Sequence, residues 1–207
     1  MKQARTRRGT ETRDRILTTA AELIHERGVA ATSIDDILAA SGTGKSQFYL
    51  YFEGKDELVR DVLGHNLDVI LSTQEALLEK LSTWKDIKTW LDALADTHNR
   101  QGLVGGCRIG SLAAEMAERD EDLRTALAEA FSRWESFLAA GLETMRDRGA
   151  LLAGADPRAL AETTMASIQG GYLLSTTKKD IRPMRNALAA AYSHLRSFQA
   201  QPTGTRS

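Results

Sequence analysis

Apolar residues recur along most of the chain at the spacing of one helix face. In the first such segment they lie four, seven and eight positions apart, at Ile16, Ala20, Leu23 and Ile24. This spacing predicts an amphipathic helix over residues 10–27, closed by a basic turn and Gly28. The pattern repeats through the sequence, and none of the three prolines lies inside a strongly periodic segment. We therefore predict an all-α fold of about nine helices with no strand.

Capping residues predict where several of these helices begin. Either hydroxyl of Thr32 and Ser33 suits the start of a short second helix. A third short helix is predicted over residues 45–52, after a glycine turn. Asp156 and Pro157 combine a capping carboxylate with a proline in the first helical position, so they predict the start of a later helix.

The two short helices and their glycine turn occupy residues 32–52, TSIDDILAASGTGKSQFYLYF. This is the plan of a helix-turn-helix, whose second helix enters the major groove of DNA. Phe48 and Phe52 are spaced to anchor that helix to a core. Its other side chains offer donors and acceptors to bases or phosphates: Lys45, Ser46, Gln47, Tyr49 and Tyr51. The alternative is an ordinary helical hairpin with a solvated face.

Residues 39–46, AASGTGKS, differ from the phosphate-binding pattern GxxxxGK[ST] only by Ala39 in place of the first glycine. In an NTPase, Lys45 would reach the terminal phosphates and Ser46 would hold magnesium. Such a loop follows a buried strand, whereas residues 33–40 have helical periodicity and two aspartates. The surrounding sequence therefore argues against an NTPase.

A longer pattern surrounds the helix-turn-helix. It comprises Ile-Leu-x-x-Ala-x-x-Leu-Ile at 16–24, Gly28, Thr32-Ser33-Ile34, Ile37, Gly42, Phe48-Tyr49-x-Tyr51-Phe52 and Lys55-Asp56-Glu57-Leu58. With these features, residues 12–63 resemble the DNA-binding domain of TetR-family transcriptional regulators. The resemblance implies DNA contacts from Thr32, Ser33, Thr43, Lys45, Ser46, Gln47, Tyr49, Leu50, Tyr51 and Lys55. It implies groove contacts for Lys45, Ser46, Gln47, Leu50 and Tyr51, phosphate contacts for Tyr49 and Lys55, and proximity to the DNA backbone for Thr32 and Ser33.

Two positions depart from the family pattern. Leu38 and Thr43 stand where the family usually has alanine and a branched apolar residue. Since small residues are favoured where two helices cross closely, we expect the second helix to sit slightly differently over the third.

The resemblance also implies a division of the chain. We expect a flexible basic arm, a helix-turn-helix domain, a ligand-binding and dimerisation domain and a flexible tail, over residues 1–9, 10–55, 56–200 and 201–207. A long fourth helix, beginning at about residue 55, is expected to link the two domains.

Two glycines, Gly170 and Gly171, lie inside a predicted helix, where each costs roughly 1 kcal/mol relative to alanine. Small residues there permit close approach of another helix. Together with one face of the last helix they predict a two-fold homodimer interface made by Ala166, Ser167, Gly170, Gly171, Leu188, Ala191, Tyr192 and Leu195. Packing within one subunit is the alternative.

The middle helices carry large apolar and aromatic side chains suited to an apolar or aromatic small-molecule effector. The candidate pocket residues are Trp90, His98, Met116, Phe131, Trp134 and Gln169. Service in an ordinary core is the alternative for most of them. His98 and Gln169 stand out because a polar group on an apolar face needs a partner, which a ligand can supply.

Residues 105–112, Gly-Gly-Cys-Arg-Ile-Gly-Ser-Leu, resemble the Gly-Cys-Pro-x-Gly segment of an LmrA/YxaF-like subgroup, with Arg108 in place of proline. Cys107 is either a redox sensor or, as lone cysteines more often are, a small buried hydrophobe.

Composition excludes several classes of protein. One cysteine permits no disulfide framework, the four histidines form no metal-binding pair, and no GxSxG elbow is present, so we expect neither an enzyme nor a cofactor or metal. No secretory signal begins the chain, and no run approaches the roughly 18 apolar residues of a membrane span, so we expect a soluble cytoplasmic protein without a membrane partner.

The net charge of −1 divides unevenly along the chain. Residues 1–55 hold nine basic and seven acidic residues, whereas residues 56–207 hold eighteen and twenty-one. Within the first fifteen residues the balance is six basic to two acidic, so the arm is suited to follow phosphates or enter a minor groove. A solvated arm without DNA contacts is the alternative.

Together these features predict a TetR-type regulator that binds a palindromic double-stranded operator as a homodimer. We expect a repressor released by a small-molecule ligand, although the residues themselves do not distinguish repression from activation. The alternative in another class is a ligand-binding or enzymatic helical protein whose helix-turn-helix is not used for DNA.

Overall fold

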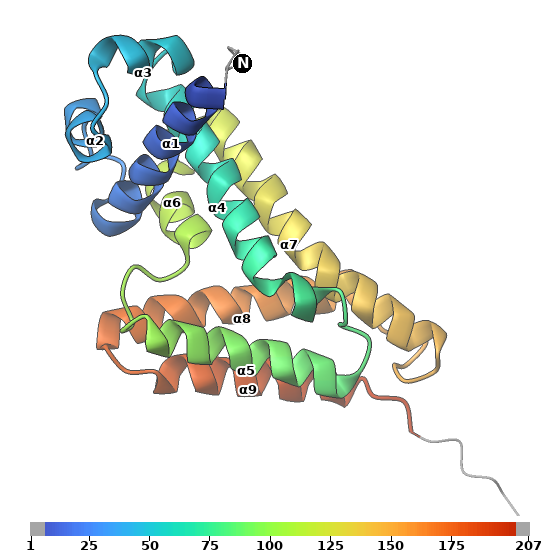
Figure 1. Ribbon diagram of the computed structural model, residues 1–207. Helices are drawn as coiled ribbons and strands as arrows, with labels where there is room; N and C mark the ends of the chain where they lie inside the picture. Colours follow the sequence, from blue (N-terminus) through green and yellow to red (C-terminus); the bar gives the residue numbers. More distant parts are fainter. Residues whose placement is uncertain (1–6, 202–207) are drawn as a thin grey trace, which may run out of the picture. The chain divides into compact units, whose positions relative to one another are not determined.

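Helices supply the regular structure of the protein. The computed structural model describes residues 7–201, and this part contains nine α-helices, no strand, and one isolated bridge between Leu151 and Gln199 (Figure 1). The helices are α1 (Arg7–Arg27), α2 (Ile34–Ser41), α3 (Lys45–Tyr51), α4 (Lys55–Leu78), α5 (Trp84–Arg100), α6 (Arg108–Met116), α7 (Glu121–Asp147), α8 (Pro157–Lys178) and α9 (Arg182–Ser197). The predicted all-α fold is confirmed. Over the same residues, no helix combines the length and apolarity that crossing a membrane requires.

The capping signals act as the sequence predicts. The backbone N–H of Asp36 donates to Ser33 Oγ at 3.1 Å, and the N–H of Ser33 donates to Asp36 Oδ2 at 2.9 Å, forming a reciprocal capping box. Hydrogen bonds from Ser33 lower the pKa of the Asp36 carboxyl. At the other end of α2, Gly42 takes a left-handed conformation (φ 62°) that suits glycine. At the start of α8, Asp156 Oδ1 accepts from two N–H groups.

Some helix boundaries differ from those predicted. α1 begins at Arg7 and not near residue 10, and an exposed ion pair between Arg7 and Glu11 spans its first turns at 3.1 Å. Residues 7–9 of the predicted arm are therefore helical. The rest of that arm, residues 1–6, lies outside the described residues, as do residues 202–207 of the predicted tail. α6 begins at Arg108, inside the glycine-rich segment 105–112.

The chain forms two compact units. The head unit comprises described residues up to 70 and residues 108–130, and the body unit comprises residues 71–107 and those from 131 onward. The long helices α4 and α7 each contribute to both units. Helix α6 and the start of α7 thus belong to the same unit as the helix-turn-helix, a division of the chain that no local sequence pattern indicated.

The core of the head unit holds α3 in place. Phe48 and Phe52 are fully buried and their ring centroids lie 5.3 Å apart. The Arg13 guanidinium lies 5.3 Å from the centre of the Phe52 ring and forms an ion pair with Asp61 at 2.5 Å. Because both phenylalanines point into this core, the opposite side of α3 must face outward.

In the body unit, α5, α8 and α9 lie side by side (Figure 1). Two glycines allow close approach of neighbouring segments. A Cβ on Gly141 of α7 would lie 1.8 Å from the backbone oxygen of Leu81, and a Cβ on Gly171 of α8 would lie 3.2 Å from Met184 Cα on α9. The backbone N–H of Met184 also donates to Ser175 Oγ at 2.9 Å. Glycine is thus required at 141 by backbone contact.

Candidate functional site

The outward side of α3 collects most of the predicted DNA-contacting residues. Lys45, Ser46, Gln47, Tyr49 and Leu50 are exposed and Tyr51 is half-buried, whereas Phe48 is fully buried. Leu50 is 62% exposed, more than Tyr49 at 45%. The helix presents a mixed surface of ammonium, hydroxyl, amide, phenol and aliphatic groups.

Two polar side chains on this surface have partners within the head unit. Lys45 Nζ lies 3.7 Å from Asp35 Oδ1 on α2, with both side chains largely exposed. Gln47 Oε1 accepts from the backbone N–H of Gly44 at 3.2 Å, at the start of α3. Exposed ion pairs of this kind contribute between 0 and about 1 kcal/mol, so Lys45 can exchange its partner for a phosphate or base at small cost.

Thr32 and Thr43 require a correction to the predicted DNA surface. The Thr32 side chain is fully buried, and its hydroxyl donates to the backbone oxygen of Gly28 at 2.8 Å. Thr43 is 8% exposed and its Oγ1 lies 2.6 Å from Ser41 Oγ. Both side chains stabilise turns inside the head unit instead of facing outward. Ser33, in contrast, is exposed at the N-terminus of α2.

Lys55, the predicted phosphate ligand at the start of α4, is engaged within the head unit. Its ammonium donates to the backbone oxygen of Val29 at 2.5 Å. The Lys55 side chain thus fastens the first turn of α4 to the segment that follows α1.

Glu115 on α6 holds the same segment, a role that sequence reasoning missed. Its carboxylate oxygens accept from the backbone N–H groups of Val29 and Ala30, each at 2.7 Å. A Cβ on Gly28, which has φ +83°, would lie 2.8 Å from Glu115 Oε2, so the close contact also favours glycine there. No local motif signals this contact, because its partners lie 85 and 86 positions apart.

A second polar contact joins α6 to α1. Arg108, at the first position of α6, donates from Nη2 to both carboxylate oxygens of Glu22 at 2.9 Å. Arg108 is the residue that replaces proline in the LmrA/YxaF-like segment. Together, Arg108 and Glu115 tie both ends of α6 to α1 and to the segment after it.

The predicted dimer residues divide between two environments. Gly171, Leu188, Ala191 and Leu195 are buried in the described protomer, and Tyr192 is half-buried with its hydroxyl donating to the backbone oxygen of Trp84 at 3.2 Å. These five residues take part in helix packing within one protomer, the alternative to a dimer interface, and their assignment to that interface stays a prediction. The residues that remain on the open side of α8 are Ala166, Ser167 and Gly170.

Two leucines that sequence reasoning missed share this open side. Leu173 is 67% exposed and Leu174 is 47% exposed. They follow Gly170 by three and four positions, the spacing that places side chains on one helix face, so the signal was present in the sequence. With Ala166 and Gly170 they form a surface of small and aliphatic residues, hereafter the α8 face.

The predicted pocket residues belong to two different units of the chain. Trp90 and Trp134 are buried in the body unit, whereas the half-buried Met116 belongs to the head unit. Trp90 Nε1 donates to Gln74 Oε1 at 2.7 Å, which favours a core role, but Trp134 Nε1 has no hydrogen-bond partner among the described residues. Phe131 is half-buried at the start of the body-unit part of α7.

His98 is the predicted pocket residue with the most distinctive surroundings. Its ring is fully buried, lies 4.8 Å from the Tyr172 ring centre in an edge-on arrangement, and has Nε2 3.3 Å from Thr176 Oγ1. Its Nδ1 has no partner within residues 7–201. Burial, followed by the positive charge of Lys179, lowers the pKa of His98, so the ring is neutral at pH 7.

Two further polar residues of the body unit differ in their environments. Gln169 is half-buried, and its amide nitrogen lies 3.5 Å from Met165 Sδ, a weak acceptor. Cys107 is 7% exposed, and burial together with this thiol raises the pKa of Tyr172. The burial of Cys107 favours the interpretation as a small hydrophobe.

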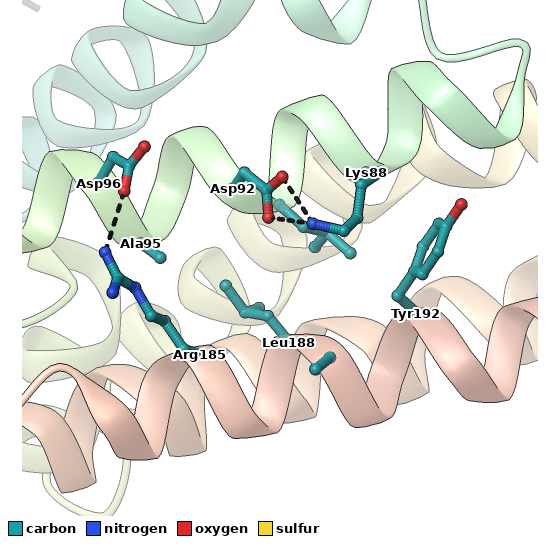
Figure 2. Close-up of a pocket in the computed structure, with 9 residues that line it drawn as sticks. Lys88, Asp92, Ala95, Asp96, Arg185, Leu188 and Tyr192 are labelled. Carbon is teal, nitrogen blue, oxygen red and sulfur yellow. Dashed lines mark hydrogen bonds and ion pairs between the residues drawn. The ribbon is translucent and has the colours of Figure 1, made fainter.

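A groove of about 390 Å³ separates α5 from α9 (Figure 2). Lys88 Nζ donates to both carboxylate oxygens of Asp92 at 2.6 and 2.7 Å, and Arg185 pairs with Asp96 at 3.5 Å. The lining residues are Lys88, Leu91, Asp92, Ala95, Asp96, Arg185, Leu188, Ala189 and Tyr192. None of the six predicted pocket residues lines it. Its charged side chains already pair across or along the walls, over an apolar floor.

Known proteins match both parts of the chain. Residues 16–62 match the model of bacterial regulatory proteins of the tetR family, and residues 84–190 match the C-terminal domain of LmrA/YxaF-like transcriptional regulators. An uncharacterised HTH-type transcriptional regulator in the lacX 3′ region of Lactococcus lactis subsp. lactis is 34% identical over 84% of this chain and 88% of its own length. The chain belongs to the TetR family of transcriptional regulators.

Two other TetR-family proteins extend the comparison. The HTH-type transcriptional repressor DhaR of Mycobacterium sp. strain GP1 is 24% identical over 90% of this chain and 93% of its own. A TetR transcriptional regulator from Chloroflexus aurantiacus, known from a crystal structure, has 25% sequence identity to this chain. The match covers 95% of this chain and 100% of the other, with a TM-score of 0.81. This TetR-family member is therefore a DNA-binding regulator of transcription and not an enzyme, and α2 and α3 are its helix-turn-helix.

Proposed function

We propose that this TetR-family regulator is a cytoplasmic repressor that binds a palindromic operator as a homodimer and leaves it when a small molecule binds. The observation that carries the DNA-binding part is the outward side of α3, where donors, acceptors and an aliphatic group are exposed together. The relative DhaR is named a repressor, which supports repression over activation.

In this proposal, outward-facing residues of α3 contact bases, whereas Lys55 contacts a phosphate. Lys45 and Gln47 are exposed on α3 and are proposed to contact bases, so Lys45→Ala and Gln47→Ala are expected to change sequence preference. The Lys55 ammonium keeps two N–H donors for a phosphate besides the one bonded to Val29. Lys55→Ala is therefore expected to weaken binding to all duplexes alike and to reduce the salt dependence, because phosphate contacts carry no sequence information.

The test measures dissociation constants for DNA upstream of the protein's own gene and for a scrambled duplex, at several salt concentrations. The proposal expects a strongly salt-dependent preference for the upstream DNA. Equal losses on both duplexes from all three substitutions would refute the division of tasks. Equal affinity of the wild type for both duplexes would refute the proposal that the upstream DNA contains an operator.

The dimer part rests on the α8 face. Leu173 and Leu174 are large, apolar and exposed, and burial of such a surface stabilises association at about 25 cal/mol per Å². Small neighbours at Ala166 and Gly170 allow a second helix to approach closely. In a two-fold dimer, two helix-turn-helices would enter successive major grooves roughly 34–36 Å apart.

Leu173→Glu tests this interface, since it places a charge at its centre. Sedimentation equilibrium is expected to show a dimer for the wild type and a monomer for the variant. Leu152→Glu is the matched control, because Leu152 is also an exposed leucine of the body unit, at 45%. Dissociation by both substitutions, or by neither, would contradict the proposed face.

The effector part rests on His98 and Trp134, whose buried nitrogen atoms lack partners among the described residues. Buried polar groups generally have a hydrogen-bond partner, and a ligand in the body unit can provide it. An aromatic alcohol such as 1-naphthol combines an apolar body with one hydrogen-bonding group. Such a probe is expected to quench tryptophan fluorescence and weaken operator binding in the wild type but not in His98→Leu.

Coupling to DNA is proposed to run through α6. Glu115 and Arg108 connect this helix to α1 and to the segment before α2. A ligand that favours a different position of α6 would shift the population away from the DNA-competent state. A probe that binds without any change in operator affinity, across a panel of aromatic alcohols, would contradict release by ligand.

A further inference from the structure

Leu50 occupies the outermost position of α3. At 100° per residue, Leu50 lies about 160° around the helix from each of the buried Phe48 and Phe52. Its side chain is 62% exposed, whereas both phenylalanine side chains are fully buried. Among the residues of α3, Leu50 therefore points most directly away from the core of the head unit.

The chemistry of this position is unusual for a surface meant for water or phosphate. Leucine has no hydrogen-bonding group, so it cannot bind a phosphate oxygen or a polar base edge. Its exposed neighbours one turn earlier, Ser46 and Gln47, carry the hydroxyl and amide groups that do so. An exposed aliphatic side chain between them stabilises a complex only when an apolar group of the partner covers it.

The major groove offers one apolar group, the C5 methyl of thymine. We propose that Leu50 reads a thymine in each operator half-site by packing against this methyl, an inference that rests on the proposed operator binding. Leu50 is thus a specificity-determining residue, and its contact is distinct from the polar contacts of Ser46 and Gln47.

Replacement of thymine by uracil tests the contact, because it deletes the methyl and leaves every hydrogen-bonding group in place. A duplex is first selected from a random library with the wild-type protein, and each thymine pair related by the two-fold axis is then replaced in turn. One symmetric pair is expected to weaken binding by about fourfold per half-site, the value of one buried methyl or methylene group.

The Leu50→Ala variant, combined with the uracil replacement, completes a double-mutant cycle. It is expected to bind the selected duplex more weakly than the wild type and to be indifferent to uracil at the sensitive pair. Tyr49→Phe is the matched control: it removes the hydroxyl expected to contact phosphate, so it should weaken binding to the thymine and uracil duplexes alike and keep the uracil sensitivity. Circular dichroism checks that both variants fold, as expected for exposed positions.

Two results would overturn the inference while leaving operator binding intact: a wild type unaffected by uracil at every thymine, or a Leu50→Ala variant as sensitive as the wild type. Failure of the library to enrich any sequence would overturn the proposed function, and the thymine contact with it.

Discussion

Local sequence signals determine the exposed surface in the head unit more completely than in the body unit. In the head unit, the two buried phenylalanines at Phe48 and Phe52 determine which side of α3 faces outward, and the capping box at Ser33 determines where α2 begins. In the body unit, the stripe of small residues on α8 serves two purposes at once. One side packs against α9 and the other is exposed.

Adjacent glycines illustrate the difference. A Cβ on Gly171 would lie 3.2 Å from Met184 Cα, but no described atom outside its own helix comes within 4 Å of the corresponding position on Gly170. The two residues differ by 100° around the same helix. Composition marks both as suited to close packing, and only the tertiary structure shows which partner each one meets.

The largest effect is expected from Gly141→Ala in the body unit. The new Cβ would lie 1.8 Å from the backbone oxygen of Leu81, which cannot move away as a side chain end would. We expect the free energy of unfolding to fall by about 3 kcal/mol, as measured by urea denaturation. Gly64→Ala is the control, since no described atom crowds that helical glycine, and it should gain about 1 kcal/mol. Similar effects at both positions would break the comparison.

In the head unit, the next largest effect is expected from Glu115→Gln. The neutral amide can keep only one acceptor oxygen for the N–H groups of Val29 and Ala30, so stability should fall by about 1–2 kcal/mol. Hydrogen exchange of these two amides should accelerate. Glu118→Gln, an exposed change just beyond α6, should leave both rates unchanged. Unchanged exchange in Glu115→Gln would show that the carboxylate does not hold the segment.

A smaller effect distinguishes the buried histidine of the body unit. The pKa of His98 is lowered in the folded protein, so between that value and the ordinary value of about 6.5 the unfolded chain binds the extra proton. Acid therefore favours unfolding, and the free energy of unfolding should fall as pH decreases from 7 to 5.

The contribution of His98 can be separated from that of His25. One proton contributes at most roughly 1.4 kcal/mol per pH unit, and His98→Asn should reduce the slope by part of this amount. The pKa of His25 in the head unit is also lowered by burial, so His25→Asn should remove a second part. A slope identical to that of the wild type in His98→Asn would contradict a buried neutral imidazole.

The smallest effect is expected from Asp35→Asn in the head unit. This change frees Lys45 from an exposed ion pair at 3.7 Å and removes a negative charge beside α3. Operator affinity should rise by about threefold at low salt, with little gain at high salt, since screening weakens exposed charges. A loss of affinity would mean that Asp35 positions Lys45 for DNA.

Prediction from sequence succeeded where the signal was local. Helical periodicity, the Ser33 capping box and the Asp156-Pro157 start all depend on residues within one or two turns, and so does the outward side of α3. It failed for Thr32 and Thr43, because hydroxyls suited to DNA are equally suited to bond the backbone or a neighbouring hydroxyl inside a turn.

Contacts between distant segments were beyond the reach of such patterns. Glu115 lies 85 positions from Ala30, and the backbone of Leu81 meets Gly141 sixty positions later. Their positions follow from how helices pack, which a single sequence does not specify locally. Leu173 and Leu174 are different, because their spacing from Gly170 already predicts that they share one helix face. This signal was present in the sequence but was missed.

Hydroxyl-radical footprinting of the protein on a selected operator tests the central claim most directly. Two TetR-type helix-turn-helices related by a two-fold axis should protect two segments on each strand, with centres about one helical turn apart and symmetric about the operator centre. Gln47→Ala should abolish this pattern at concentrations where the wild type gives it. A wild type that protects no segment, or a single asymmetric one, would contradict a dimeric operator-binding regulator.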